Sequence, residues 1–331
     1  MVLKMGSVLI TGASGRVGRH LINALLERGE DLRVLVKEKM IEFENVEVFY
    51  GDVLDKESLR KAVDGVDTIY HLAAIIDYLA PKDLMFQVNV IGTKNLLEVS
   101  KGKKMIYLST TGVMGKKLKQ LPANENTPCK PSDYYAETKF EAEKLARENG
   151  AIIIRSVDVY GLGFEEGYFS VFEMLEKGRM PTFGDGKNII QYIHVNDLVQ
   201  ALLLAKEKGK PGEIYIVAGK DMKTQRELYN IICKYLNVPF QEKHVSVKIA
   251  KTLLYFKNLS SRVKGIKPKF ISEYINKLSA NRVFDITKAR NELEFEPEID
   301  YERGISEMIE EYKKSKEQKE EIPKKQSEKQ S

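Results

Sequence analysis

The chain has 331 residues, of which 43% are hydrophobic and 31% are charged, and its formal net charge at pH 7 is +5. This composition is typical of a soluble globular protein and excludes a fibrous or largely disordered one. No run of 18 apolar residues occurs, so no membrane-spanning segment is expected, and the evenly spread charge argues against nucleic acid as a partner.

The few cysteines and histidines of the chain argue against disulfide bonds and metal sites. The two cysteines, Cys129 and Cys233, are too few for a disulfide framework or a structural zinc site. The four histidines show no metal-ligand spacing. The first residues reach glycine and serine too early for a secretory signal. We therefore expect a cytoplasmic protein that binds no metal.

Short apolar runs alternate with amphipathic stretches through the first half of the chain. Six of the runs predict buried β-strands, namely Val8–Ile10, Arg33–Val36, Val46–Tyr50, Thr68–Leu72, Met105–Leu108 and Ile152–Ile154. Apolar residues recur at helical spacing between several of these runs. The alternation predicts an α/β fold: a Rossmann-type doubly wound parallel sheet with helices on both faces.

The pattern loosens after Gly161, where glycines and a proline interrupt the apolar runs. The later elements are predicted as a strand at Tyr192–His194, a helix from Asn196, a strand at Ile214–Val217 and a helix over 224–236. Segment 245–264 carries apolar residues at helical spacing with lysines between them. We expect it to form part of a lobe that covers the substrate, and the alternative is a helix that lies on a membrane surface.

These patterns divide the chain into three parts. A dinucleotide-binding core is expected over residues 1–160, with returns of the chain near 185–217. A smaller substrate-binding lobe is expected over 161–184 and 218–312. The final segment, 313–331, is rich in charge and poor in apolar residues, and we expect it to be disordered.

A glycine-rich loop, TGASGRVG, follows the first predicted strand and opens the first predicted helix. Glycines in this context permit a tight turn and a close approach of the backbone to a pyrophosphate, which the helix N-terminus attracts. The loop therefore predicts a dinucleotide site. Its candidate cofactor-binding residues are Gly12, Gly15, Arg16, Val17 and Gly18.

The end of the second predicted strand bears on the choice between NAD and NADP. An acidic residue there binds the ribose hydroxyls, whereas a basic residue meets a 2′-phosphate. Lys37 lies at this position and Arg16 lies in the glycine loop, so two cations favour NADP. Glu38 is adjacent, so NAD remains the alternative.

The candidate catalytic group is Tyr135 with Lys139, which share one face of a predicted helix because they are four residues apart. A tyrosine has an ordinary pKa of about 10, and a nearby ammonium favours its phenolate. Thr110 closes the fifth predicted strand, at the sheet edge where doubly wound proteins bind ligands. We expect Thr110 to hold a substrate oxygen while Tyr135 exchanges its proton.

Taken together, these motifs resemble the extended short-chain dehydrogenases/reductases, the superfamily of the NAD-dependent epimerases and dehydratases. The resemblance covers residues 7–312 and is carried by the glycine loop, Gly51-Asp52-Val53, His71-Leu72-Ala73-Ala74, Asn89, LSTTGVMG, the Tyr135/Lys139 pair, Val159-Tyr160-Gly161 and His194-Val195-Asn196-Asp197-Leu198. It implies that Asp52 and Val53 contact the adenine, Ala73 the pyrophosphate side, and Tyr135 and Lys139 the nicotinamide ribose. The further cofactor-binding candidates that it implies are Leu72, Ala74 and Asn89.

The sequence departs from the family pattern at two positions, the first beside the expected nicotinamide and the second at the expected substrate site. Ser156 replaces the usual proline after Arg155. Nucleotide-sugar enzymes of the family usually carry an arginine four residues before the histidine of the H-V-x-D-L motif, and here that position is Ile190. An isoleucine cannot clamp a diphosphate as an arginine does.

The sequence therefore predicts an NAD(P)-dependent oxidoreductase that interconverts a carbonyl and a secondary alcohol in a small-molecule substrate. The C-terminal half resembles the 3β-hydroxysteroid dehydrogenase and dihydroflavonol reductase branch. One alternative is a nucleotide-sugar epimerase or dehydratase with tightly bound NAD, in which Arg155, Arg262 or Arg282 binds the diphosphate. Another is a non-catalytic dinucleotide sensor. By analogy with relatives, we expect a homodimer formed through helices near 83–101 and 134–149.

Overall fold

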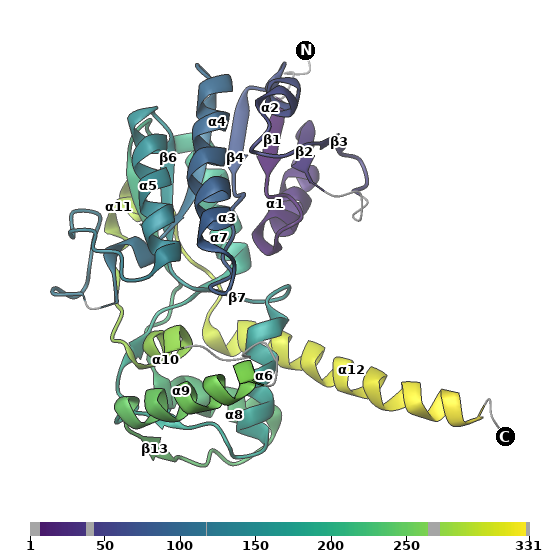
Figure 1. Ribbon diagram of the computed structural model, residues 1–331, viewed down its shortest axis with the longest axis vertical. Helices are drawn as coiled ribbons and strands as arrows, with labels where there is room; N and C mark the ends of the chain where they lie inside the picture. Colours follow the sequence, from purple (N-terminus) through teal and green to yellow (C-terminus); the bar gives the residue numbers. More distant parts are fainter. Residues whose placement is uncertain (1–6, 38–42, 117, 264–271, 329–331) are drawn as a thin grey trace. The chain divides into compact units, whose positions relative to one another are not determined.

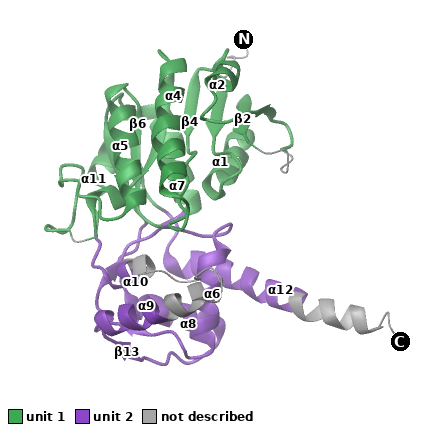
Figure 2. Ribbon diagram, in the orientation of Figure 1, with its two compact units in different colours: residues 1–158, 195–218, 284–297 green, residues 159–194, 219–283, 298–331 purple. Residues whose placement is uncertain are grey.

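The computed structural model describes residues 7–37, 43–116, 118–263 and 272–328 (Figure 1). It divides into two compact units, each made of three segments of the chain (Figure 2). Unit 1 comprises Met1–Asp158, Val195–Ala218 and Phe284–Pro297, and unit 2 comprises Val159–His194, Gly219–Val283 and Glu298–Ser331. In this division the first return to the core begins at Val195, and the segment that starts at Phe284, which the sequence placed in the lobe, belongs to unit 1.

Unit 1 is built on a seven-stranded sheet in the order β11-β6-β5-β4-β1-β2-β3, with all neighbours parallel. Its strands are β1 Val8–Thr11, β2 Leu32–Val36, β3 Glu47–Tyr50, β4 Thr68–His71, β5 Lys104–Thr110, β6 Ile152–Ser156 and β11 Ile214–Val217. Strands β1, β6 and β11 are rich in Val and Ile and buried on both faces, as a sheet covered by helices on both sides requires. The predicted α/β Rossmann-type sheet is thus confirmed.

Helices cover both faces of this sheet (Figure 1). The helices of unit 1 are α1 Arg16–Glu27, α2 Lys56–Val63, α3 Lys82–Phe86, α4 Gly92–Val99, α5 Tyr134–Glu148, α7 Val195–Lys208 and α11 Thr287–Leu293. Helix α4 packs between α2 and α5 on one side of the sheet, and α7 packs with α1 and α11 on the other. A π-helical turn, Gln87–Ile91, joins α3 to α4, and a 3₁₀ turn, Thr111–Met114, follows β5.

Unit 2 is a small mixed unit with short paired strands and a helical core. Its elements are β7 Val159–Tyr160, α6 Glu165–Glu176, β8 Thr182–Phe183, β9 Ile189–Ile190, β10 Ile193–His194, β12 Lys223–Thr224, α8 Gln225–Leu236, β13 His244–Val245, α9 Val247–Val263, α10 Ser272–Ser279 and α12 Tyr301–Glu328. Helix α8 packs against both α6 and α12. Phe172, Leu228, Ile232 and Met308 are buried where these helices meet. The predicted helix at 224–236 begins after a capping box between Thr224 and Glu227.

Part of the segment that was expected to be disordered, 313–331, is helical in the described structure. Helix α12 continues to Glu328. Tyr312 is buried and its hydroxyl donates to Glu176, and Lys316 forms an ion pair with the same carboxylate at 2.9 Å. Lysine and glutamate are good helix formers, so a charged segment extends a helix that is already anchored by these contacts.

Candidate active site

The predicted site residues of unit 1 follow the carboxyl ends of its central strands. The glycine loop follows β1, Ala73 and Ala74 follow β4, and Thr110 ends β5. The sheet order reverses between β1 and β4, because the chain extends from β1 toward β3 on one side and from β4 toward β11 on the other. In doubly wound sheets, ligands bind at the carboxyl ends of strands at this switch point.

The glycine loop is packed so closely that Gly12 and Gly18 have no room for a side chain. Gly12 has φ of 75°, and a Cβ there would lie 2.6 Å from the amide nitrogen of Ala73. A Cβ at Gly18 would lie 2.4 Å from the carbonyl oxygen of Gly12. The amide of Gly15 donates to that same oxygen at 3.0 Å, and helix α1 begins at the next residue, Arg16. A glycine-rich loop at a helix N-terminus fits a pyrophosphate.

Lys37 follows β2 and is held by an acidic neighbour. Its Nζ lies 2.9 Å from a carboxylate oxygen of Asp52, and 70% of its side chain is exposed. Burial opposes ionisation of Asp52, but hydrogen bonds from Lys37 and from the Leu54 amide outweigh it and lower the pKa of that carboxyl. Val53 is buried beside Gly92. Glu38, the acidic alternative at the ribose, lies outside the described residues.

A chain of buried polar groups connects β1 and β4 to the helices on one face of the sheet. His71 lies 2.6 Å from the Thr11 hydroxyl through Nδ1 and 2.9 Å from the Thr93 hydroxyl through Nε2. Because the Thr93 hydroxyl donates to the Asn89 carbonyl, Nε2 carries the proton and donates to Thr93. Burial, together with the charge of Lys139, lowers the pKa of His71 to about 3, so the ring is neutral.

Asn89, expected from the family resemblance to bind the cofactor, has a bridging position. It lies in the π-helical turn and only 1% of its surface is exposed. Its side-chain oxygen accepts from the Ile75 amide at 2.8 Å, and its nitrogen donates to the Ile75 carbonyl and to the Thr138 hydroxyl. Asn89 therefore ties the loop after β4 to helix α5.

Helix α5 carries Tyr135 and Lys139 on consecutive turns, and Asp133 caps its first turn by accepting from the Ala136 amide. Lys139 is 3% exposed; its Nζ donates to the carbonyl oxygen of Leu108 at 2.8 Å and lies 4.1 Å from the centre of the Tyr107 ring. Burial lowers the pKa of this ammonium to about 7, and the charge of Glu143 one turn later opposes that shift.

Tyr135 and Thr110 have more open surroundings than Lys139. Tyr135 is half-buried, with its ring edge-on to Tyr78 at 6.0 Å between centroids. The Thr110 hydroxyl oxygen accepts from the Gly112 amide at 3.0 Å, which starts the 3₁₀ turn. A threonine hydroxyl that accepts such a bond can still donate its hydrogen. The local capping role and the expected role toward a substrate oxygen are thus compatible.

A buried ion pair, which the sequence analysis did not anticipate, lies one turn after Lys139. Glu143 accepts three hydrogen-bond contacts from the Arg155 guanidinium, at 2.6 to 3.1 Å, and one from the Ser109 hydroxyl at 2.5 Å. Glu143 and Arg155 are 2% and 3% exposed. The signal in the sequence is a glutamate on the buried alanine face of α5. Two of the three Arg155 guanidinium nitrogens are engaged in this pair, and the side chain is buried.

The other two arginines of the epimerase alternative belong to unit 2. The side chain of Arg262 lies outside the described residues. Arg282 joins unit 2 through its backbone amide, which donates to the Ile189 carbonyl. Ile190, at the position where relatives usually have arginine, is 2% exposed within the core of unit 2.

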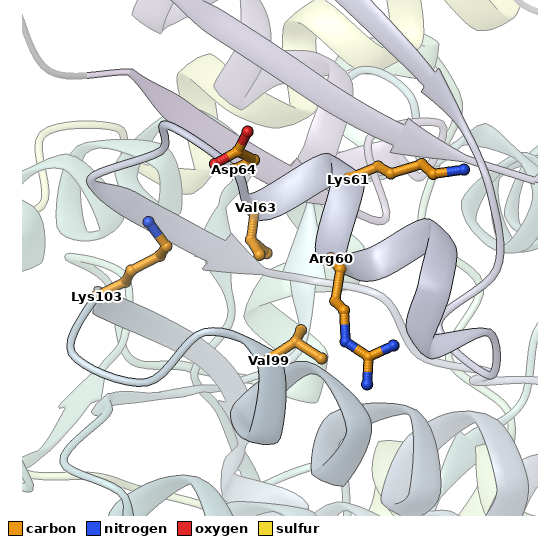
Figure 3. A pocket seen from close by; sticks show the side chains of 6 residues that line it. All are labelled: Arg60, Lys61, Val63, Asp64, Val99 and Lys103. Carbon is orange, nitrogen blue, oxygen red and sulfur yellow. The ribbon is translucent and has the colours of Figure 1, made fainter.

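A surface hollow near the opposite ends of the strands is separate from this site. It lies beside the ends of α2 and α4, before β4 and β5 begin, and is lined by Arg60, Lys61, Val63, Asp64, Val99 and Lys103 (Figure 3). The charged ends of its basic side chains point in different directions (Figure 3). The hollow therefore offers no converging ligand set. Among the described residues, no group of three or more His, Cys, Asp or Glu side chains could hold a metal ion.

Comparison with known proteins identifies the family of this chain. The model of the NAD dependent epimerase/dehydratase family matches residues 8–218. The chain belongs to this family. The model of GDP-mannose 4,6 dehydratase matches residues 169–308. The members and relatives of the epimerase/dehydratase family are NAD(P)-dependent dehydrogenases, epimerases and dehydratases, so the protein is an enzyme.

Relatives of this family member include enzymes of different reaction classes. A 3-beta-hydroxysteroid dehydrogenase of Mycolicibacterium neoaurum is 28% identical over 92% of this chain and 91% of its own. An undecaprenol-linked N-acetylglucosamine 4-epimerase of Escherichia coli O157:H7 is 26% identical over 86% of this chain and 89% of its own. In fold, the chain matches the UDP-glucose 4-epimerase of Thermotoga maritima with a TM-score of 0.74, at 24% identity, covering 93% and 99% of the two chains.

The glycine packing yields the first prediction for this epimerase/dehydratase family member. Gly18→Ala should weaken binding of the nicotinamide dinucleotide at least about tenfold and destabilise the fold by about 1–3 kcal/mol, because the new methyl overlaps backbone. Titration calorimetry and thermal unfolding measure both effects. Gly167→Ala is the matched control, since nothing lies within 4 Å of its Cβ. Unchanged dinucleotide affinity in Gly18→Ala would show that the glycine loop is not part of the dinucleotide-binding site.

The buried ion pair yields the second prediction. Arg155→Met should lower the free energy of unfolding by about 3–5 kcal/mol, because it leaves the Glu143 carboxylate charged and buried without its partner. The matched control, Lys144→Met, removes a half-exposed ion pair with Glu141 on the same helix and should cost about 1 kcal/mol or less. Urea denaturation measures both. An equal decrease in the free energy of unfolding in the two variants would show that the buried ion pair stabilises the fold no more than the exposed one.

Proposed function

We propose that the protein is an NAD(P)-dependent oxidoreductase that interconverts a carbonyl and a secondary alcohol at Thr110, Tyr135 and Lys139. The observation that carries this proposal is the anchored pair on α5. Lys139 is fixed by the Leu108 carbonyl and the Tyr107 ring, and Tyr135 stands one turn before it. Thr110 ends the strand whose carbonyl Lys139 uses, two residues further on. A proton donor, an oxygen-binding hydroxyl and a cation thereby come from adjacent elements.

Each residue of the candidate site has a separate role in the proposed reaction. The glycine loop would hold a nicotinamide dinucleotide, which when bound would supply two-electron redox chemistry. Tyr135 donates a proton to the carbonyl oxygen during reduction and accepts it during oxidation. The Thr110 hydroxyl donates a hydrogen bond to the same oxygen. Lys139, when protonated, stabilises the phenolate that Tyr135 becomes after it has donated. Asn89 positions α5 against the loop after β4 and does not touch substrate.

We propose a substrate without a diphosphate, such as a steroid-like or other largely apolar alcohol or ketone. Ile190 is buried in the core of unit 2, and Arg155 is paired with Glu143. Neither offers the bidentate donor that a diphosphate requires. The relative that acts as a 3-beta-hydroxysteroid dehydrogenase matches the chain over nearly its full length.

The third prediction concerns Tyr135. Tyr135→Phe should lower kcat for carbonyl reduction at least about a thousandfold, because it removes the proton donor. Dinucleotide affinity should stay within about threefold of that of the unchanged protein, because the phenyl ring keeps its packing on Tyr78. Steady-state rates with a panel of ketones and dinucleotide titration measure the two quantities.

The matched control is Tyr134→Phe, since the neighbouring tyrosine is also half-buried and contacts Lys82 instead. It should keep kcat within about twofold. Wild-type rates in Tyr135→Phe would contradict the assignment. Purified protein that retains NAD and interconverts UDP- or dTDP-sugars without net cofactor turnover would instead identify an epimerase. Binding of dinucleotide without turnover of any carbonyl or sugar would indicate a sensor.

The fourth prediction concerns the cofactor, for which we propose NADP. Arg16 is exposed at the start of α1, and Lys37 is largely exposed after β2. NADPH should therefore bind more tightly than NADH, and Lys37→Ala should narrow that difference about tenfold, because it removes a cation and leaves the negative charge of Asp52 uncompensated. Isothermal titration with both nucleotides measures the ratio. Lys144→Ala, an exposed lysine on α5, should leave the ratio unchanged. Tighter binding of NADH by the unchanged protein would assign the site to NAD.

We also propose that the enzyme acts in the cytoplasm as a homodimer. The helices expected to pair, near 83–101 and 134–149, correspond to α3, the π-helical turn, α4 and α5. Leu84 and Phe86 on α3 are 44% and 37% exposed, and Phe140 on α5 is half-buried. Apolar side chains on these two elements would be covered in such a dimer.

A further inference from the structure

Ser109 lies on β5 between two residues that belong to the candidate site. The carbonyl oxygen of Leu108, just before it, accepts from Lys139 at 2.8 Å, and Thr110, just after it, ends the strand. Ser109 itself is 4% exposed, and its hydroxyl donates to a carboxylate oxygen of Glu143 at 2.5 Å. The proton transfer proposed above gives this hydroxyl no role.

The Ser109 hydrogen bond crosses from the sheet to helix α5. Ser109 is the register partner of Arg155 on β6, so the two side chains lie next to each other on one face of the sheet. Both reach the Glu143 carboxylate, which extends from the helix packed against β5 and β6. One carboxylate thus joins two strands to the helix that carries the candidate catalytic residues.

The ion pair does not depend on this hydroxyl. Arg155 contacts both carboxylate oxygens of Glu143 through its Nε and Nη2 atoms, at 2.6 to 3.1 Å. The buried charges therefore compensate each other without Ser109. What the Ser109 hydroxyl adds is a link between β5 and α5, and a hydroxyl that donates to a carboxylate forms one of the stronger hydrogen bonds in proteins.

This link is adjacent to a hydroxyl whose position matters for the proposed reaction. A displacement of about 1 Å in a reacting group can lower a rate about a hundredfold. Thr110 must reach the same substrate oxygen as Tyr135, and Tyr135 belongs to α5. The end of β5 must therefore be fixed against that helix. Two consecutive residues of the strand are held there, Leu108 through its carbonyl and Ser109 through its side chain.

We propose that Ser109 is a positioning residue for the carbonyl–alcohol reaction, and that it holds Thr110 where Thr110 and Tyr135 can bind one substrate oxygen. This inference rests on the proposed function. Because its side chain is buried against Glu143, Ser109 acts through α5 and does not touch the substrate.

Ser109→Ala tests the proposal, since it removes the hydroxyl and keeps the Glu143–Arg155 pair. It should lower kcat for carbonyl reduction about tenfold and leave KM and dinucleotide affinity within about threefold, because the reacting groups are misplaced while the binding surfaces are kept. Ser100→Ala is the matched control. Ser100 is also buried, and its hydroxyl donates to the Leu96 carbonyl of the preceding helix α4 at 2.7 Å. This control should keep kcat within about twofold.

A double variant tests whether Ser109 acts through Thr110. Thr110→Ala should itself lower kcat, and adding Ser109→Ala should lower it no more than about twofold further, because no Thr110 hydroxyl is left to position. A residue with a general structural role would lower kcat by the same factor in both backgrounds. Thermal unfolding shows whether each variant keeps its fold.

The outcomes separate this inference from the proposed function. Unchanged kcat in Ser109→Ala, or the same tenfold loss in the Thr110→Ala background, would overturn the inference and leave the proposed function standing. A fall in kcat accompanied by an equal fall in dinucleotide affinity would also overturn it, since the variant would then have a disturbed binding site. No turnover of any ketone by the unchanged protein would contradict the proposed function itself, and the inference with it.

Discussion

The buried ammonium of Lys139 is the constraint on which the candidate site depends. A cation that is 3% exposed is stable only if its donors are engaged, and Lys139 meets this condition with the Leu108 carbonyl and the Tyr107 ring. These contacts fix helix α5 against β5 at the strand end. The Glu143–Arg155 pair, one turn later, fixes the same helix against β6. Both sets of contacts together fix the position of Tyr135 on the same helix.

Much of this arrangement follows from local sequence. Buried parallel strands are continuous apolar runs, so the six predicted strands are found in the structure with small changes at their ends. The glycine loop was predictable because glycine alone fits where a Cβ would overlap the Ala73 amide or the Gly12 carbonyl. The positions of Tyr135 and Lys139 follow from helical spacing, although their catalytic roles rest on family resemblance and on the variants proposed above.

Other features depend on pairings between distant residues, which one sequence does not reveal. From the sequence, Arg155 on β6 is a candidate ligand for a diphosphate. In the structure, packing places Glu143, twelve residues earlier, beside it, and the two form an ion pair. The contacts of the Asn89 amide with Ile75 and Thr138 depend on the π-helical turn, which the sequence pattern did not predict. Composition suggested disorder for the charged end of the chain, whereas Tyr312 and Lys316 gain a shared partner in Glu176 from α6. In each case tertiary contacts override the local pattern.

The interleaving of the two units has a consequence for how this protein can be divided. The backbone passes from one unit to the other five times, at 158/159, 194/195, 218/219, 283/284 and 297/298. No single cut separates the units, and no contiguous fragment of the gene encodes either of them whole. A fragment that ends at Asp158 would lack strand β11 of unit 1, and a fragment that ends at Val283 would lack helix α12 of unit 2. The protein therefore cannot gain a different unit 2 through a single gene fusion.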